Sequence, residues 1–263
     1  MRYAARVEYD GAGYSGWQAQ KHNVRTVQGV VESALAKVAD HPVSIITAGR
    51  TDAGVHATHQ VIHFDSTANR SNSDWCRGAN RFMDHDARLH WVCPVDNEFH
   101  ARFSAVSRSY RFVILNSKIA PAINRAFVTP VRSPLNVELM REAGRLLLGE
   151  HDFSSFRAAG CQAHSPIRTV SHFELDSQGQ YIWFDICANA FLQHMVRNIA
   201  GSLIEVGSGK RSVDWFSELL VVRDRTLAGI TAVPNGLYLT GVDYPANYQL
   251  PSNRALISFW NEQ

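Results

Sequence analysis

The segment from Ala48 to Phe64 reads AGRTDAGVHATHQVIHF and gathers groups that can do chemistry. Between two apolar runs it holds an arginine, a carboxylate and three histidines. Three interpretations fit these residue types. The histidines can bind a metal ion, Asp52 can act as a nucleophile or base, or the segment can be a polar turn in which Asp52 caps the backbone.

The histidines of this segment, His56, His59 and His63, are spaced by three and four residues, which would place them on one side of a helix. The apolar residues around them are typical of a strand instead, and strand alternation separates His63 from its neighbours. No H-E-x-x-H motif and no cysteine partner accompanies them. The sequence therefore predicts hydrogen-bonding histidines and no metal site.

Other nucleophiles and cofactor motifs are not indicated. The chain has no G-x-S-x-G elbow, no Walker lysine after the loop GYSGWQ and no dinucleotide fingerprint. Asp52 lies between two expected strands, where Gly49 and Gly54 permit a sharp turn. A carboxylate there can be a nucleophile, a base or the cap of an Asx-turn, and residue types alone favour the Asx-turn.

The composition is that of a globular enzyme, with 263 residues, 45% hydrophobic and 19% charged. No run reaches the length of a membrane span, and the start, MRYAARVEYDG, alternates instead of resembling a signal peptide. The four cysteines form no C-x-x-C pair. We therefore expect free thiols in a cytoplasmic protein without a membrane partner.

The charge is uneven along the chain. The net charge is only +2, but the 26 basic residues comprise 22 Arg and 4 Lys, and residues 101–170 hold ten of them against four acidic residues. Arginine binds phosphates and stacks on bases, so this segment is a candidate RNA-contacting surface. Scattered surface arginines, or an arginine bias set by genomic base composition, would give the same counts.

Hydrophobic periodicity predicts a repeated order of elements. In the first half, strands are expected at 3–9, 43–48, 60–65 and 88–95, and helices from Thr26, as N-cap, and near 73–83. In the second half, strands are expected from Tyr110, at 169–176, at 181–187 and from Leu237, and helices from Asn136, at 191–206 and at 212–222. Each half thus contains a β-α-β-β-α-β order.

This order predicts an α+β fold of two ferredoxin-like halves, residues 1–103 and 104–263, whose antiparallel or mixed sheets lie side by side around a central cleft. The halves share no visible sequence repeat, and the seam near residues 97–107 has little linker character. A rigid cleft is therefore expected there.

The motif GRTDAGVHATHQ closely resembles the catalytic loop of the tRNA pseudouridine synthase A family. YDGAGYSGWQAQ, TVQGVVESAL, ARFSAVSRSYRFVI, LLGEHDFSSFRAAGCQAHSPIR, NAFLQHMVRNIAGSLIEVGSGK and NGLYLTGVDYP continue the resemblance in order, over nearly the whole chain. The spacing of AVPNG before the last strand is less typical. The resemblance implies isomerisation of uridine to pseudouridine at positions 38, 39 and 40 of the anticodon stem-loop of tRNA, with no cofactor and with a homodimer.

The resemblance also implies roles for individual residues. Asp52 matches the catalytic aspartate, Arg197 the arginine that pairs with it, and Tyr110 the tyrosine that contacts the uracil. Arg50 matches an arginine that fills the space left by the flipped base, so Tyr110, Arg50 and Arg197 are the expected substrate-binding residues. The second half would then carry Tyr110, Arg197 and the dimer surface.

Charge alone adds Arg102, Arg108, Arg111, Arg157 and Arg168 as candidate phosphate contacts. Three alternatives stay open: a non-catalytic RNA-binding protein or tRNA chaperone of the same fold, a histidine-based metal hydrolase, and a synthase that modifies different uridines, because site choice comes from RNA shape.

Overall fold

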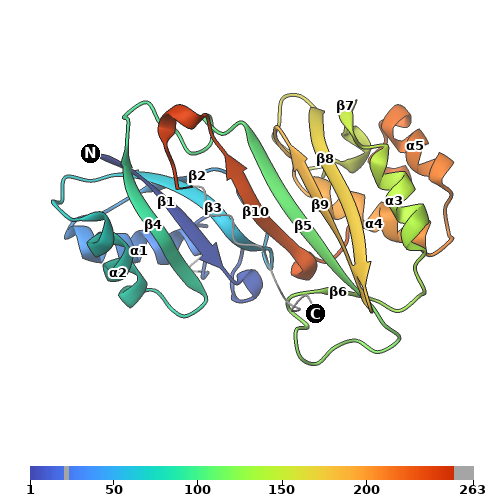
Figure 1. The fold of residues 1–263 in the computed structure, drawn as a ribbon, viewed down its shortest axis with the longest axis horizontal. Coiled ribbons are helices and arrows are strands. Elements are labelled where there is room, and N and C mark those ends of the chain that lie inside the picture. The colour runs from blue at the N-terminus through green and yellow to red at the C-terminus, as the bar shows by residue number, and fades with distance from the viewer. Residues whose placement is uncertain (21–23, 252–263) are drawn as a thin grey trace. The chain divides into compact units, whose positions relative to one another are not determined.

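The chain combines α-helices with sheets in which most strand pairs are antiparallel, which confirms the predicted α+β class. The computed structural model describes residues 1–20 and 24–251 and divides into two compact units (Figure 1). The first unit comprises Met1–Ser107 and the chain from Tyr238 on, and the second comprises Arg108–Leu237. No helix among the described residues is long and apolar enough to cross a membrane.

The first unit is built on a sheet whose centre is the N-terminal strand. Its elements are β1 (Arg2–Tyr9), the short 3₁₀ turn η1 (Gly11–Gly13), α1 (Val27–Ala39), β2 (Ile45–Thr47), β3 (His56–Asp65), α2 (Asn72–Phe82), β4 (Ala87–Val95) and nearly all of β10 (Leu237–Asp243). β1 pairs antiparallel with β3 and β4, and β2 pairs antiparallel with β3. β10 runs parallel to β3, with Tyr238 opposite His56.

The helices of the first unit begin at the capping residues that their sequences provide. Thr26 accepts a hydrogen bond from the backbone N–H of Gly29, which confirms it as the N-cap of α1. Ser71 and Asp74 form a reciprocal capping box at the start of α2. These bonds satisfy backbone donors that have no partner within the helix.

Aromatic side chains fill both faces of this sheet. On one face the buried Trp75 of α2 lies 5.5 Å from Tyr3 and 5.1 Å from Phe64, centroid to centroid. On the other face the buried Phe99 packs against His63 and against Tyr244 at 5.1 Å. β3 is therefore buried along nearly its whole length.

The second unit consists of an antiparallel sheet covered by helices. Its elements are β5 (Ser107–Asn116), β6 (Thr129–Val131), α3 (Val137–Arg145), β7 (Gly149–Asp152), β8 (Ile167–Gln178), β9 (Tyr181–Ala188), α4 (Met195–Gly207) and α5 (Val213–Val222), together with short 3₁₀ turns. β5, β9, β8 and β7 pair in that order, and β6 pairs parallel with β5. The predicted hairpin of β8 and β9 is confirmed.

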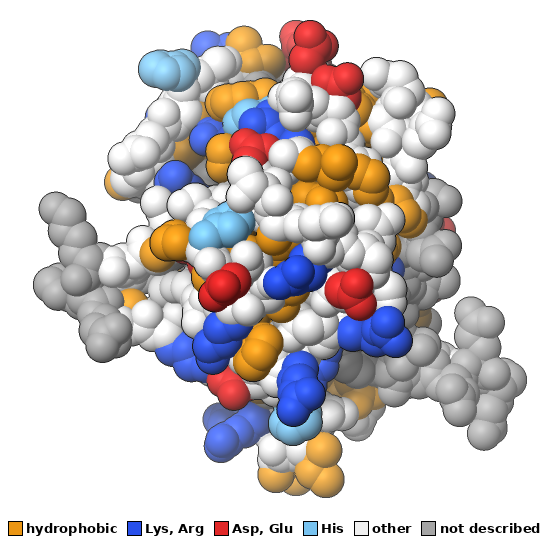
Figure 2. Space-filling model, turned by 90° about the vertical axis from the view of Figure 1, so that its left-hand side faces the viewer, with side chains coloured by type: hydrophobic (Ala, Val, Ile, Leu, Met, Phe, Trp, Pro, Cys, Tyr) orange, Lys and Arg blue, Asp and Glu red, His pale blue; other side chains and the backbone are white. Residues whose placement is uncertain are grey.

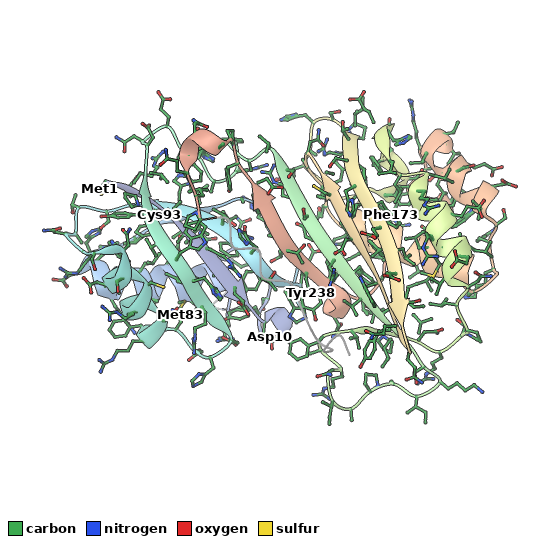
Figure 3. The ribbon with its side chains drawn as sticks, viewed as in Figure 1. Met1, Asp10, Met83, Cys93, Phe173 and Tyr238 are labelled. Atoms are coloured by element: carbon green, nitrogen blue, oxygen red, sulfur yellow. The ribbon has the colours of Figure 1, made fainter. Side chains whose placement is uncertain are left out.

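Strict alternation along β9 directs one set of residues into the core. Phe184 is stacked between Phe112 and Phe173, at centroid distances of 5.6 and 5.4 Å. Phe173 lies beneath α3, where a Cβ on Gly144 would come within 2.0 Å of its ring (Figure 3). The absence of a side chain at Gly144 lets α3 approach the sheet.

The structure differs from the sequence-based expectation at three points. β3 begins at His56 instead of residue 60, so all three histidines belong to the strand. α4 begins at Met195, because His194 has a φ of 61° and interrupts the helix expected from residue 191. The last strand, β10, pairs with β3, so the compact units are not the expected halves 1–103 and 104–263.

We expect Trp75→Ala to lower the free energy of unfolding by about 3–5 kcal/mol, because it leaves a cavity beside the stacked rings of Tyr3 and Phe64. Phe82→Ala on the same helix is the matched control. Its side chain is 47% exposed, so a loss of about 1 kcal/mol or less is expected. Urea denaturation of both variants measures the difference, and equal losses would contradict this packing.

Candidate active site

Asp52 lies at the start of a tight turn between β2 and β3. The backbone N–H of Val55 donates to the carbonyl of Asp52 at 3.2 Å, and Gly54 has a φ of 78°, which favours glycine. The side chain of Asp52 is half-buried, whereas that of Arg50, two residues earlier, is exposed. The Asp52 side chain thus projects from a turn that is closed by a backbone hydrogen bond.

The residue before Asp52 is held from two sides. Thr51 is buried, and its hydroxyl shares a hydrogen bond of 2.8 Å with the hydroxyl of Tyr9. Its carbonyl accepts the backbone N–H of Trp17 at 3.0 Å. Because Tyr9 and Trp17 are themselves buried, these bonds fix the main chain at Asp52.

The loop GAGYSGW supports the turn through backbone contacts that only glycine permits. A Cβ on Gly11 would lie 2.0 Å from the carbonyl oxygen of Val55. Gly16 has a φ of 91°, and a Cβ there would come within 3.0 Å of the carbonyl oxygen of Thr51. Sequence analysis identified this segment only as a loop, and its close approach to residues 51–55 is visible only in the structure.

Two of the three histidines that follow Asp52, His56 and His63, accept hydrogen bonds from backbone N–H groups. Nδ1 of His56 accepts the N–H of Gly11 at 3.0 Å, and its ring stacks on Tyr238 at 4.8 Å. Tyr238 lies at the same end of the unit as Asp10, which caps η1 (Figure 3). These contacts fix the beginning of β3 directly after the Asp52 turn.

Nδ1 of His63 accepts the N–H of Ala101 at 3.0 Å, and burial lowers the pKa of His63 to about 4, so the ring is neutral at physiological pH. The hydrogen bonds of His56 and His63 confirm the prediction for these two residues. Within residues 1–20 and 24–251, no three His, Cys, Asp or Glu side chains are placed to hold a metal ion.

Tyr110 belongs to β5 of the second unit. It is buried and shares the face of β5 that carries Phe112. Its ring contacts Phe191 edge-on at 4.9 Å, and Phe191 lies in the turn that leads into α4. Tyr110 is therefore next to the amino-terminal end of α4.

Arg197 lies in the first turn of α4. Its Nε donates to the carbonyl oxygen of Ala232 at 2.8 Å, and its own carbonyl accepts the N–H of Ala232 at 3.1 Å. A cation in the first turn opposes the helix dipole, so helix stability does not explain an arginine here. The bond at Nε restricts the direction in which the guanidinium points.

The four residues assigned from the family motif are thus distributed over both units. Arg50 and Asp52 share one loop of the first unit, and Tyr110 and Arg197 belong to adjoining elements of the second.

The arginines suggested by charge have different surroundings. Arg111 forms two hydrogen bonds with Asp185, at 2.9 and 2.7 Å, so its charge is compensated. Arg108, Arg157 and Arg168 donate to backbone carbonyls, and Arg102 is exposed. On the face in Figure 2, Lys and Arg side chains lie among Asp and Glu side chains.

A family profile described as tRNA pseudouridine synthase matches residues 5–104 and 143–245, which together exceed half of the chain. The chain belongs to this family. A protein of Nitrosococcus oceani named tRNA pseudouridine synthase A is 52% identical over 260 residues, which cover 99% of this chain and 100% of the relative. A protein of the same name from Aeromonas hydrophila is 54% identical over 95% of this chain and 93% of its own length.

Among solved structures, a chain in a Cbf5-Nop10-Gar1 complex is 9% identical, with a TM-score of 0.34. A likeness at this level does not establish a shared fold.

We expect Gly11→Ala to displace Val55 and the Asp52 turn, because the added carbon would overlap a backbone oxygen. The rate of pseudouridine formation in tRNA should fall about 100-fold, with a loss of stability of about 1–3 kcal/mol. Gly13→Ala in the same turn is the control, since its Cβ would meet no backbone atom, only the side-chain ends of Arg25 at 3.3 Å and Asp86 at 3.7 Å. Single-turnover rates and thermal denaturation measure both effects, and similar rates for the two variants would contradict the tight contact.

Proposed function

We propose that this chain converts uridine to pseudouridine at positions 38, 39 and 40 in the anticodon stem-loop of tRNA. The family isomerises uridine in tRNA, and the enzyme is an isomerase. The choice of these three positions is the part that we propose. The observation that carries the proposal is that Asp52, within the motif GRTDAGVH, lies in a turn whose backbone is held by hydrogen bonds.

The reaction breaks the bond between ribose C1′ and uracil N1, rotates the base, and joins C1′ to C5. The proton on C5 is lost and N1 gains one, so the product is an isomer of the substrate and no oxidant is consumed. In this proposal the Asp52 carboxylate is the nucleophile. It can act at C1′, at C6 of the base, or by assisting elimination of the base from the sugar, and each course needs the ionised form.

Arg197 supplies the positive charge that keeps such a carboxylate ionised in a site from which water is excluded. Its attachment to Ala232 supports this role, because a counter-charge is effective only when it is oriented. Tyr110 stacks against the uracil and takes the C5 proton in the closing step. Its buried ring beside Phe191 supports a contact role.

Arg50 assists entry of the substrate in this proposal. A uridine stacked in an RNA stem must be flipped out of the helix, which costs a few kcal/mol. The exposed guanidinium of Arg50 would occupy the space that the base leaves. Its position in the same loop as Asp52 would couple base flipping to capture of the nucleoside.

The finer features of the protein belong to the same proposal. A homodimer is expected from the family resemblance, and a cytoplasmic location from the cysteines, which form no C-x-x-C pair. In the first unit the strand order β4, β1, β3, β2 supports the ferredoxin-like description.

We expect Asp52→Asn to abolish turnover, with a loss of at least about 10⁴-fold, because the amide cannot replace the nucleophile. Binding of tRNA should change little. Asp65→Asn, at the exposed end of β3, is the control and should keep the wild-type rate. The experiment measures pseudouridine at positions 38–40 of tRNA incubated with each protein.

Turnover by the Asp52 variant would refute the nucleophile. A wild-type protein that binds tRNA without forming pseudouridine would indicate the non-catalytic RNA-binding alternative. Pseudouridine found only at other positions would refute the proposed site choice.

We expect the double substitution Arg102→Glu and Arg108→Glu to weaken tRNA binding and to flatten its dependence on salt, because two phosphate contacts are lost. Arg77→Glu with Arg81→Glu on α2 changes the net charge by the same amount outside residues 101–170 and is the control. Affinities measured at several salt concentrations separate the two pairs. Equal slopes would contradict a phosphate-contacting role for Arg102 and Arg108.

A further inference from the structure

A cluster of polar side chains in the second unit has no part in the chemistry described above. Asn198 and Ser202 are fully buried on α4, one turn apart. Arg225 and Thr231 approach them from the segment 225–231, which follows α5. Buried polar groups are costly unless each is satisfied, so a cluster of this kind needs an explanation.

The guanidinium of Arg225 is the centre of the cluster. Its Nη2 donates to the side-chain oxygen of Asn198 at 3.0 Å and to the hydroxyl of Thr231 at 2.9 Å. Its Nη1 donates to the carbonyl oxygen of Gly229 at 3.0 Å. One side chain thereby joins the segment 225–231 to α4.

Asn198 forms further hydrogen bonds between α4 and its surroundings. Its side-chain oxygen also accepts the hydroxyl of Thr231 at 2.7 Å, and its amide donates to the carbonyl of Phe156 at 2.7 Å. The N–H of Gly229 donates to the hydroxyl of Ser202 at 3.0 Å. The segment is therefore bonded to α4 through side chains and backbone alike.

The backbone of the segment lies directly on the helix. A Cβ on Gly201 would come within 1.8 Å of the carbonyl oxygen of Ile230, and a Cβ on Gly229 within 2.7 Å of the backbone nitrogen of Ser202. Small shifts of the segment would therefore be resisted by close packing as well as by hydrogen bonds.

The residue after Thr231 is Ala232, which holds Arg197 through both of its backbone groups. The position of the Ala232 carbonyl decides where the guanidinium of Arg197 points. Arg225 fixes the residues that immediately precede this carbonyl. A chain of contacts thus runs from Arg225 through Thr231 and Ala232 to Arg197.

We propose that Arg225 is a positioning residue for the reaction, which orients Arg197 by holding the segment 228–232 on α4. The inference rests on the role of Arg197 in the proposed function. Arginine suits the task because its planar fork reaches several acceptors at once, whereas a lysine ammonium is a single point. Burial lowers the pKa of Arg225, yet an arginine remains charged in proteins.

A cavity of about 580 Å³, lined in part by Arg225, Asn198 and Thr231, borders the cluster. Water can therefore reach the acceptors when the guanidinium is removed. Substitution of Arg225 should for this reason disturb the segment without unfolding the unit.

The test compares Arg225→Lys, Arg197→Lys and the double variant in single-turnover pseudouridine formation. Arg211→Lys is the control, because Arg211 is exposed and packs over Trp215. We expect Arg225→Lys to slow the reaction about 100-fold, with tRNA affinity within about twofold of wild type. Arg211→Lys should keep the wild-type rate.

The double variant decides whether Arg225 acts through Arg197. If it does, the double variant is no slower than Arg197→Lys alone, because the two residues act as one unit. The positioning role would be overturned if the rate losses of the two single variants multiplied in the double variant. It would also be overturned if Arg225→Lys kept the wild-type rate. Both results leave the proposed function intact as long as wild-type turnover depends on Asp52, whereas a wild-type protein without turnover overturns the function itself.

Discussion

The immobilisation of Thr51 is the constraint on which the proposed role of Asp52 depends. A carboxylate can act on one nucleoside atom only if the backbone that carries it holds its place to a fraction of an ångström. The buried hydroxyl pair of Tyr9 and Thr51 and the bond from Trp17 provide this restraint. Gly11 and Gly16 contribute by having no side chain, since any larger residue would push the turn away.

The same principle operates at the arginine of the second unit. Arg197 is held by a backbone group, and that group is held by a cluster of hydrogen bonds around Arg225 and Asn198. In both places a charged residue is thus held through backbone groups of its own segment or of a neighbouring one. Preorganised polar groups of this kind reduce the reorganisation needed when charge develops in a transition state.

The last strand shows how a distant part of the chain supports the loop that carries Asp52. β10 follows the segment that holds Arg197, and its Tyr238 pairs with His56 and stacks on its ring. His56 in turn accepts a hydrogen bond from Gly11, beside the Asp52 turn. A non-local contact thus completes the support of a loop that lies nearly two hundred residues earlier in the chain.

The sequence by itself determined the α+β class, the order of the principal helices and strands, the N-cap at Thr26 and the family, because these follow from local periodicity, capping chemistry and ordered motifs. Through the family resemblance it also made Asp52 the candidate nucleophile, although residue types alone favoured a plain turn. Only the tertiary structure revealed the pairing of β10 with β3, the contact of Gly11 with Val55 and the cluster around Arg225. Each of these joins residues far apart in the chain, and a contact of that kind leaves no periodic signal in a single sequence.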